Sequence, residues 1–115
     1  MTLPVATEEQ EQIVVVQYCR LHNVPCFHVP NSTWTKSIQV KMRNKRLGVS
    51  PGVPDLFVVV AGRLIGIEMK RTKGGTVSPF QKDWIQTLND AGIETRVCRG
   101  AEEAINFIEE IQGGR

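Results

Sequence analysis

One stretch constrains the fold of this 115-residue chain more than any other: two apolar segments joined by a short turn between residues 52 and 70. Both segments are rich in Val, Ile and Leu and are bounded by Pro and Gly, which is typical of the two β-strands of a hairpin. Gly62 and Arg63 form the predicted two-residue turn, with the glycine in its first position. One face of the hairpin is then wholly apolar and is expected to cover the core. Its members are Leu56, Val58, Val60, Ile65, Ile67 and Met69.

The opposite face of the hairpin carries charged groups at one end. With this turn, Asp55 pairs with Lys70 and Phe57 pairs with Glu68, and directly opposed residues point to the same side of a sheet. Asp55, Glu68 and Lys70 are therefore expected to lie together, whereas a shift of one residue would separate the two carboxylates. Two interpretations remain open. One is an ordinary salt bridge at a strand end; the other is a site for a divalent metal, since Mg²⁺ binds carboxylate oxygens, water and phosphate.

The length of the chain allows one domain, predicted over residues 1–115 with its core at about 8–111. No apolar run approaches the roughly 20 residues of a membrane span. The first residues lack the basic and apolar segments of a signal peptide, so we expect a cytoplasmic protein. The three cysteines, Cys19, Cys26 and Cys98, are widely spaced and odd in number, which favours reduced, buried thiols over disulfides or a zinc site.

The net charge of +2 is unevenly distributed along the chain. Between Asn31 and Pro54 there is no acidic residue, but there are five basic ones: Lys36, Lys41, Arg43, Lys45 and Arg46. A second basic group comes at and after the end of the hairpin: Lys70, Arg71, Lys73 and Lys82. Basic residues around a carboxylate cluster suit a polyanionic substrate such as DNA. The alternative for the first group is a solvated helix face.

The remaining segments alternate between predicted helices and strands. Helices are predicted over residues 7–22, 37–47, 78–91 and 101–111, and strands over 24–29 and 93–98. Thr7 and Ser78 are the predicted N-caps of two of these helices. The third helix is expected to bury one stripe, formed by Phe80, Trp84, Ile85 and Leu88. This order of elements predicts an α/β fold, a mixed four-stranded sheet flanked by helices.

Several motifs together resemble those of a known nuclease family. Pro54-Asp55 followed by Glu68-Met69-Lys70 is the signature of the PD-(D/E)xK nuclease superfamily, whose core is similar to that of restriction endonucleases. A longer series resembles the VRR-NUC domain in order and spacing, from about Glu8 to Ile111. Its parts are His28-Val29-Pro30-Asn31, the basic helix, Gly52-Val53-Pro54-Asp55-Leu56, Ile67-Glu68-Met69-Lys70 and Ser78-x-x-Gln81-x-x-Trp84. That family includes stand-alone proteins of phages and bacteria, so the resemblance implies a protein in the cytoplasm of a bacterial or phage-infected cell.

The resemblance implies a nuclease that depends on Mg²⁺ or Mn²⁺ and acts on structured DNA. In that family, Asp55 and Glu68 would hold the metal together with the main-chain carbonyl of Met69. Lys70 would be the catalytic lysine and Gln81 would lie near it. The family also has a glutamate in the first helix, for which we favour Glu11, with Glu8 second and Glu9 also close in sequence.

The leading functional hypothesis is a homodimeric endonuclease that resolves four-way (Holliday) DNA junctions. A two-fold symmetric junction needs paired cuts, and a symmetric dimer supplies two sites related by the same axis. The alternatives are a non-cleaving DNA-binding module of the same fold and a restriction-type enzyme acting on linear duplex. The expected DNA contacts are Lys36, Lys41, Arg43, Lys45, Arg46, Arg71 and Lys73.

Three further residues have weaker predictions. Many family members have a Gly-rich segment after the Pro-Asn pair, but this chain has Trp34 there, which would either stack on a base or pack beneath the loop. His22 and His28 have no partners at metal-ligand spacing, so we expect structural roles for both.

Overall fold

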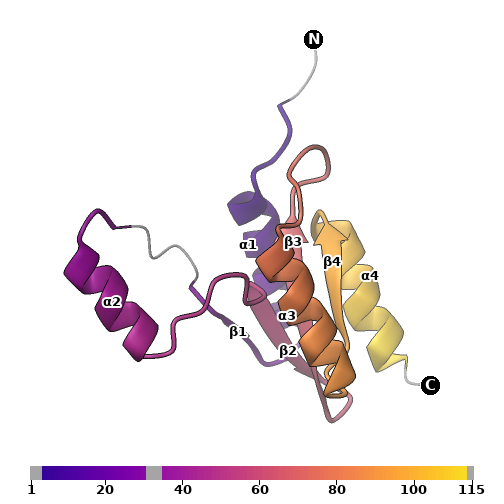
Figure 1. Cartoon of the computed structure of the whole chain (residues 1–115). Coiled ribbons are helices and arrows are strands. Elements are labelled where there is room, and N and C mark those ends of the chain that lie inside the picture. The colour runs from indigo at the N-terminus through magenta and orange to yellow at the C-terminus, as the bar shows by residue number, and fades with distance from the viewer. Residues whose placement is uncertain (1–3, 31–34, 114–115) are drawn as a thin grey trace.

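The computed structural model describes residues 4–30 and 35–113, and within them four helices and four strands form a single sheet with its covering helices (Figure 1). The elements are α1 (Glu8–Leu21), β1 (Cys26–His28), α2 (Ile38–Arg46), β2 (Leu56–Val60), β3 (Arg63–Lys70), α3 (Pro79–Asp90), β4 (Thr95–Arg99) and α4 (Ala101–Gln112). The strand order is β1-β2-β3-β4; the first two pairs are antiparallel and β3–β4 is parallel. The predicted mixed four-stranded α/β fold is confirmed.

The helices begin where their capping residues predict. The Thr7 hydroxyl accepts the Gln10 N–H, and the Gln10 side chain accepts the Thr7 N–H, which completes a capping box. Two strands start later than predicted because the residues before them close the preceding helix. The Val24 N–H donates to the Cys19 carbonyl at 2.7 Å, and the Ile93 N–H donates to the end of α3 in the same way.

The turn of the central hairpin differs from the prediction. It is formed by Ala61 and Gly62, whose φ angles of 52° and 72° are both positive, as a type I′ turn requires. Sequence rules place Gly, Asn or Asp at such positions, so the left-handed Ala61 was not anticipated. The strands pair as Val60 with Arg63, and the predicted turn, Gly62-Arg63, is wrong.

The corrected register changes which residues face each other. Phe57 faces Gly66, and continuing the pairing one step past β2 brings Asp55 level with Glu68 rather than Lys70. Because the pairing shifts by an even number of residues, both carboxylates still project from the same face. The local geometry of the predicted charged cluster therefore survives an incorrect turn.

The core lies on the other face of the hairpin, as predicted, and α1 and α4 cover it, while α3 lies across the opposite face (Figure 1). The six predicted hairpin residues of this face are all buried. Phe107 of α4 also belongs to this core, whereas Ile105 of the same helix is only half-buried. In α3 the predicted stripe is wrong for Phe80, which is 60% exposed. Trp84, Ile85 and Leu88 are half-buried.

The basic helix α2 stands apart from the sheet (Figure 1). It has no buried residue, and its largest apolar side chains are exposed: Ile38 by 71%, Met42 by 57% and the adjoining Leu47 by 68%. No helix in the described part of the chain is both long and apolar enough to cross a membrane.

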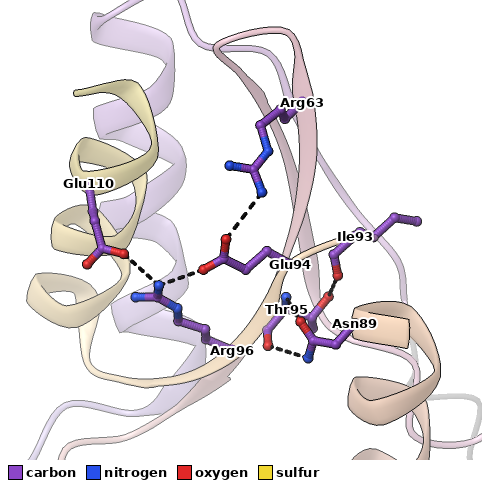
Figure 2. A network of polar contacts seen from close by, with 7 residues as sticks. All are labelled: Arg63, Asn89, Ile93, Glu94, Thr95, Arg96 and Glu110. Atoms are coloured by element: carbon purple, nitrogen blue, oxygen red, sulfur yellow. Dashed lines mark hydrogen bonds and ion pairs between the residues drawn. The ribbon is translucent and has the colours of Figure 1, made fainter. Parts of the chain in front are cut away.

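A polar network fixes the end of the sheet that lies away from the charged cluster (Figure 2). Arg63 at the start of β3 contacts Glu94 at 3.2 Å, and Arg96 of β4 contacts both Glu94 and Glu110 of α4 at 2.6 Å. Nearby, the Asn89 side chain exchanges two hydrogen bonds with the main chain of Thr95. These contacts tie β3, β4, α3 and α4 together at this end of the sheet.

Candidate active site

Four segments meet at the carboxyl end of β3: the start of α1, the turn before β2, the last residues of β3 and the first turn of α3. The turn brings Asp55 against β3, where its Oδ2 accepts the Met69 N–H at 3.0 Å. Glu68 and Lys70 project from β3 on the same side as Asp55 because they are two residues apart in a strand. The predicted triplet of Asp55, Glu68 and Lys70 is thus brought together.

Two members of the triplet are buried and Asp55 is half-buried, which sets the cluster apart from an ordinary surface salt bridge. Glu68 is 1% exposed and Lys70 is 6% exposed. The Lys70 Nζ lies 3.7 Å from Glu68 Oε2, a distance typical of an ion pair. Taking two charges out of water carries a desolvation penalty that one such pair rarely recovers. The buried ion pair is therefore expected to contribute little to stability, and its burial favours a functional site over a structural salt bridge.

Glu68 has the most perturbed environment of the three residues. Burial raises its pKa from 4.5 to about 8, and the negative charge of the neighbouring Asp55 carboxylate adds to this rise. Glu8 raises the pKa further, while Lys70 lowers it. Glu68 Oε1 is a buried oxygen without a hydrogen-bond partner among the described residues. Such an atom is unfavourable unless a proton or a cation occupies the space beside it.

Gln81 holds the other oxygen of Glu68, and the capping box of α3 sets its orientation. The Gln81 Oε1 accepts the Ser78 N–H at 2.8 Å, so its amide nitrogen faces outward from the helix end. That nitrogen donates to Glu68 Oε2 at 3.2 Å. The Ser78-x-x-Gln81 motif therefore serves two purposes, to start α3 and to orient a buried carboxylate.

Gly52 explains how the turn comes so close to α3. Its φ is +87°, and a Cβ atom there would lie 2.5 Å from the Phe80 carbonyl carbon and 2.7 Å from the Gln81 nitrogen. Only glycine allows both this conformation and this approach of two backbones. The contact fixes the turn that carries Asp55 against the helix end that carries Gln81. It also accounts for the exposed side chain of Phe80, whose main chain faces Gly52.

The first-helix glutamates occupy different environments. Glu11, the favoured candidate, accepts the Ala101 N–H at 3.1 Å and so caps α4, whose N-cap Gly100 offers no side chain. Glu8 is half-buried and adds its negative charge to the surroundings of Glu68. It also lines a cavity of about 490 Å³. The residues around this cavity are Glu8, Glu9, Gln12, Ile13, His28 and Asp55. Glu8, rather than Glu11, therefore shares this cavity with Asp55 and adds to the negative charge around Glu68.

Most of the predicted DNA-contacting residues lie on α2 or just before it. All seven are exposed, and none of their side chains forms an ion pair with the described part of the chain. Arg71 and Lys73 lie in the loop after β3. Arg99, which the sequence did not single out, holds this loop by donating to the carbonyls of Gly74 and Gly75. Trp34 lies outside the described residues.

The donor set fits a hard divalent cation with few protein ligands. Over residues 4–30 and 35–113, no three His, Cys, Asp or Glu side chains gather into a metal-binding cluster. Asp55 and Glu68 thus offer two carboxylates, with backbone carbonyl, water and phosphate left to complete the coordination. Mg²⁺ is commonly held in this way, by one or two carboxylates with several waters and substrate oxygens.

Together, the four-stranded sheet, the paired carboxylates and the adjacent lysine define a domain of the PD-(D/E)xK nuclease type. The sequence profile of the VRR-NUC domain matches residues 6–102, so the chain belongs to the VRR-NUC family. It is similar to a solved structure described as a VRR_NUC domain protein, with 26% sequence identity and a TM-score of 0.75. The match covers 92% of this chain and 88% of that one. No curated protein matches the sequence.

Proposed function

We propose that this protein is a metal-dependent endonuclease that hydrolyses phosphodiester bonds in DNA, with residues 1–115 forming one nuclease domain. The observation that carries the proposal is the buried Glu68, which lies beside a second carboxylate and a lysine and whose Oε1 has no hydrogen-bond partner in the described part of the chain. A chain that did not need this cluster would gain stability from replacing it with apolar residues. Membership of a nuclease-type family supports the same conclusion.

In this proposal, Asp55 and Glu68 hold Mg²⁺ or Mn²⁺ together with the main-chain carbonyl of Met69. The contact of Asp55 Oδ2 with the Met69 N–H leaves the other Asp55 oxygen for the cation. When bound, the metal lowers the pKa of a coordinated water and offsets negative charge on the phosphate. The Glu68 carboxyl must lose its proton first, so metal binding and deprotonation are coupled.

The neighbouring residues position the reacting groups. Lys70 provides a buried ammonium next to Glu68, where it would contact a phosphate oxygen or orient the attacking water. Gln81 donates a hydrogen bond to Glu68 Oε2, so Oε1 would be the oxygen that binds the cation. Glu8, the first residue of α1, is proposed in place of Glu11 as the first-helix carboxylate of the active site.

DNA is the proposed substrate because of the distribution of positive charge. Lys41, Arg43, Lys45 and Arg46 form a cationic helix with no acidic residue in its sequence, and Lys36 precedes it. Cations that are not engaged by the protein's own carboxylates remain available for phosphates. Arg71 and Lys73 extend this charge to the loop beside the site.

A homodimer acting on four-way junctions is the finer part of the proposal. Ile13 and Val14 of α1 are 50% and 45% exposed, and the apolar side chains of α2 are exposed as well. Contiguous exposed apolar side chains commonly mark an interaction surface. A two-fold dimer would place two sites for paired cuts on a two-fold junction. Light scattering should give about twice the 12.9 kDa mass of the chain, and a mass near 13 kDa would exclude the dimer.

The experiment that tests the activity uses a fluorescently labelled four-way junction, a flap and a linear duplex with Mg²⁺, Mn²⁺ or EDTA. Wild type should cut the junction only with metal, while Asp55→Asn, Glu68→Gln and Lys70→Met should each be inactive. Asp83→Asn, on the exposed side of α3, is the matched control and should cut normally. Binding without cleavage would favour the non-cleaving module, and cleavage of linear duplex alone would favour a restriction-type enzyme.

A further inference from the structure

His28 contacts the main chain of Asp55 at the edge of the candidate active site. His28 ends β1 and pairs with Leu56, so it lies beside the turn that carries Asp55. Its Nδ1 lies 2.7 Å from the Asp55 carbonyl oxygen. The same oxygen also accepts the Val29 N–H at 3.0 Å. Both lone pairs of this carbonyl are therefore used, one by the strand ladder and one by the imidazole.

The contact fixes the tautomer of the imidazole. A carbonyl oxygen can only accept, so Nδ1 must carry the proton. The Gln12 Nε2 lies 3.1 Å from the same nitrogen. Because an amide nitrogen and a protonated Nδ1 are both donors, the oxygen and nitrogen of the Gln12 amide must be exchanged, so that the oxygen accepts the Nδ1–H. Gln12 and His28 both line the cavity next to Asp55. His28 thus joins α1, β1 and the Asp55 turn at one atom.

Asp55 is consequently held at two points. Its main-chain oxygen is fixed by β1 through His28 and Val29, and its Oδ2 is fixed by the Met69 N–H of β3. Asp55 lies in the turn before β2, outside the regular ladder of the strands. Its direction therefore depends on these few contacts. Outer contacts of this kind commonly set the aim of a metal-binding carboxylate.

We propose that His28 is a positioning residue that acts through its Nδ1–H on the Asp55 carbonyl and thereby aims the Asp55 carboxylate. This inference rests on the proposed function only where it concerns metal binding; the contact of His28 with Asp55 is independent of it. It goes beyond a merely structural role, because His28 is exposed and contributes no core packing. The proposal requires the hydrogen-bond donor at the δ position alone.

Amide replacements separate the two nitrogens of the ring. The Asn Nδ2 occupies nearly the place of His Nδ1, whereas the Gln Nε2 occupies nearly that of His Nε2. The variants are therefore His28→Ala, His28→Asn and His28→Gln, with His22→Ala as the control because His22 is an exposed histidine at the end of α1.

The first measurement is made without metal. In EDTA, amide hydrogen exchange at Met69 should become at least tenfold faster in His28→Ala and His28→Gln, because the carboxylate that accepts this N–H is no longer held. His28→Asn and the control should match wild type. Unchanged exchange at Met69 in His28→Ala would overturn the proposal, whatever the protein does with metal or DNA.

The second measurement is Mn²⁺ binding. His28→Ala should bind Mn²⁺ about tenfold more weakly or worse, since loss of an outer contact typically weakens metal affinity 10- to 100-fold. Cleavage should recover at saturating Mn²⁺ with the KM for DNA unchanged, and His28→Asn should restore the affinity. Rescue by His28→Gln alone would overturn the proposal in favour of a substrate contact through Nε2. A wild type that binds no Mn²⁺ would instead contradict the proposed function, and the exchange experiment would still decide the role of His28.

Discussion

Replacing Glu68 by Gln should stabilise the metal-free protein at alkaline pH while removing its function. The raised pKa means that the folded state holds a proton on Glu68 that the unfolded chain releases at lower pH. A tenfold change in proton affinity is worth about 1.4 kcal/mol. Moving the pKa from 4.5 to about 8 therefore makes the ionised carboxyl destabilising by roughly 3–5 kcal/mol. The amide avoids this ionisation, accepts from Gln81 and can donate to Asp55.

The sign of the pH dependence follows from the direction of the shift. Below pH 4.5, Glu68 is protonated in both states and the variant has no advantage. As the pH rises towards 8, wild type loses the stability that its bound proton supplied. The free energy of unfolding of Glu68→Gln should then exceed that of wild type by roughly 2–4 kcal/mol. Urea unfolding in EDTA at pH 5 and pH 8 measures the difference.

The control for this experiment is Glu102→Gln, an exposed glutamate in the first turn of α4. It should change the free energy of unfolding by less than about 0.5 kcal/mol at either pH. Added Mn²⁺ should stabilise wild type but not Glu68→Gln. The reasoning is refuted if Glu68→Gln is less stable than wild type at pH 8, or if the difference between them is the same at both pH values.

Three further results are expected. Gly52→Ala should lower stability by about 2 kcal/mol or more and impair cleavage, because the added Cβ would overlap the start of α3. Gly62→Ala has open space around it and should lose only about 1 kcal/mol, the cost of its positive φ. Equal losses of stability for the two variants in thermal melts would contradict the close approach of Gly52 to α3. Glu8→Gln should reduce cleavage with little change in stability, whereas Glu11→Ala should lower stability by about 1 kcal/mol with little change in cleavage, because α4 loses its cap; loss of cleavage in a folded Glu11→Ala variant, with Glu8→Gln still active, would restore the original assignment. Replacing Lys41, Arg43 and Lys45 of α2 together by Ala should lower the slope of log K for DNA binding against log salt concentration by up to about 3. An unchanged slope would show that these residues form a solvated helix face and do not contact DNA.

The sequence predicted the carboxylate cluster even though it predicted the wrong turn. The face on which Asp55 and Glu68 lie depends only on whether the pairing shifts by an even or an odd number of residues, and the shift caused by the Ala61 turn is even. The exact partner of Asp55 depends on the turn conformation. Ala61 adopts a left-handed φ that residue preferences do not indicate, so this detail was out of reach.

The role of Glu11 was unpredictable for a different reason. Helical periodicity places Glu8 and Glu11 on one face of α1, and nothing local distinguishes their partners. The distinction comes from Gly100, 89 residues away from Glu11 in sequence, which leaves the start of α4 without a side-chain cap. The glycine directly before the predicted helix 101–111 was the available signal that another element supplies the acceptor.

Burial on α3 was mispredicted at Phe80 because helical periodicity indicates a face but not where neighbouring backbones approach. Here the Gly52 turn occupies the space in front of the first turn of α3. In contrast, the motif Ser78-x-x-Gln81 was informative at both levels, since its capping geometry alone orients the amide that reaches Glu68.

The central claim is that Asp55 and Glu68 hold a divalent metal, and calorimetric titration of the protein with Mn²⁺ tests it most directly. Wild type and Asp83→Asn should bind Mn²⁺, more tightly at pH 8 than at pH 6, because the metal competes with the proton whose pKa at Glu68 is raised to about 8. Asp55→Asn and Glu68→Gln should not bind it at either pH. Binding by both of these variants with the affinity of wild type would contradict the account.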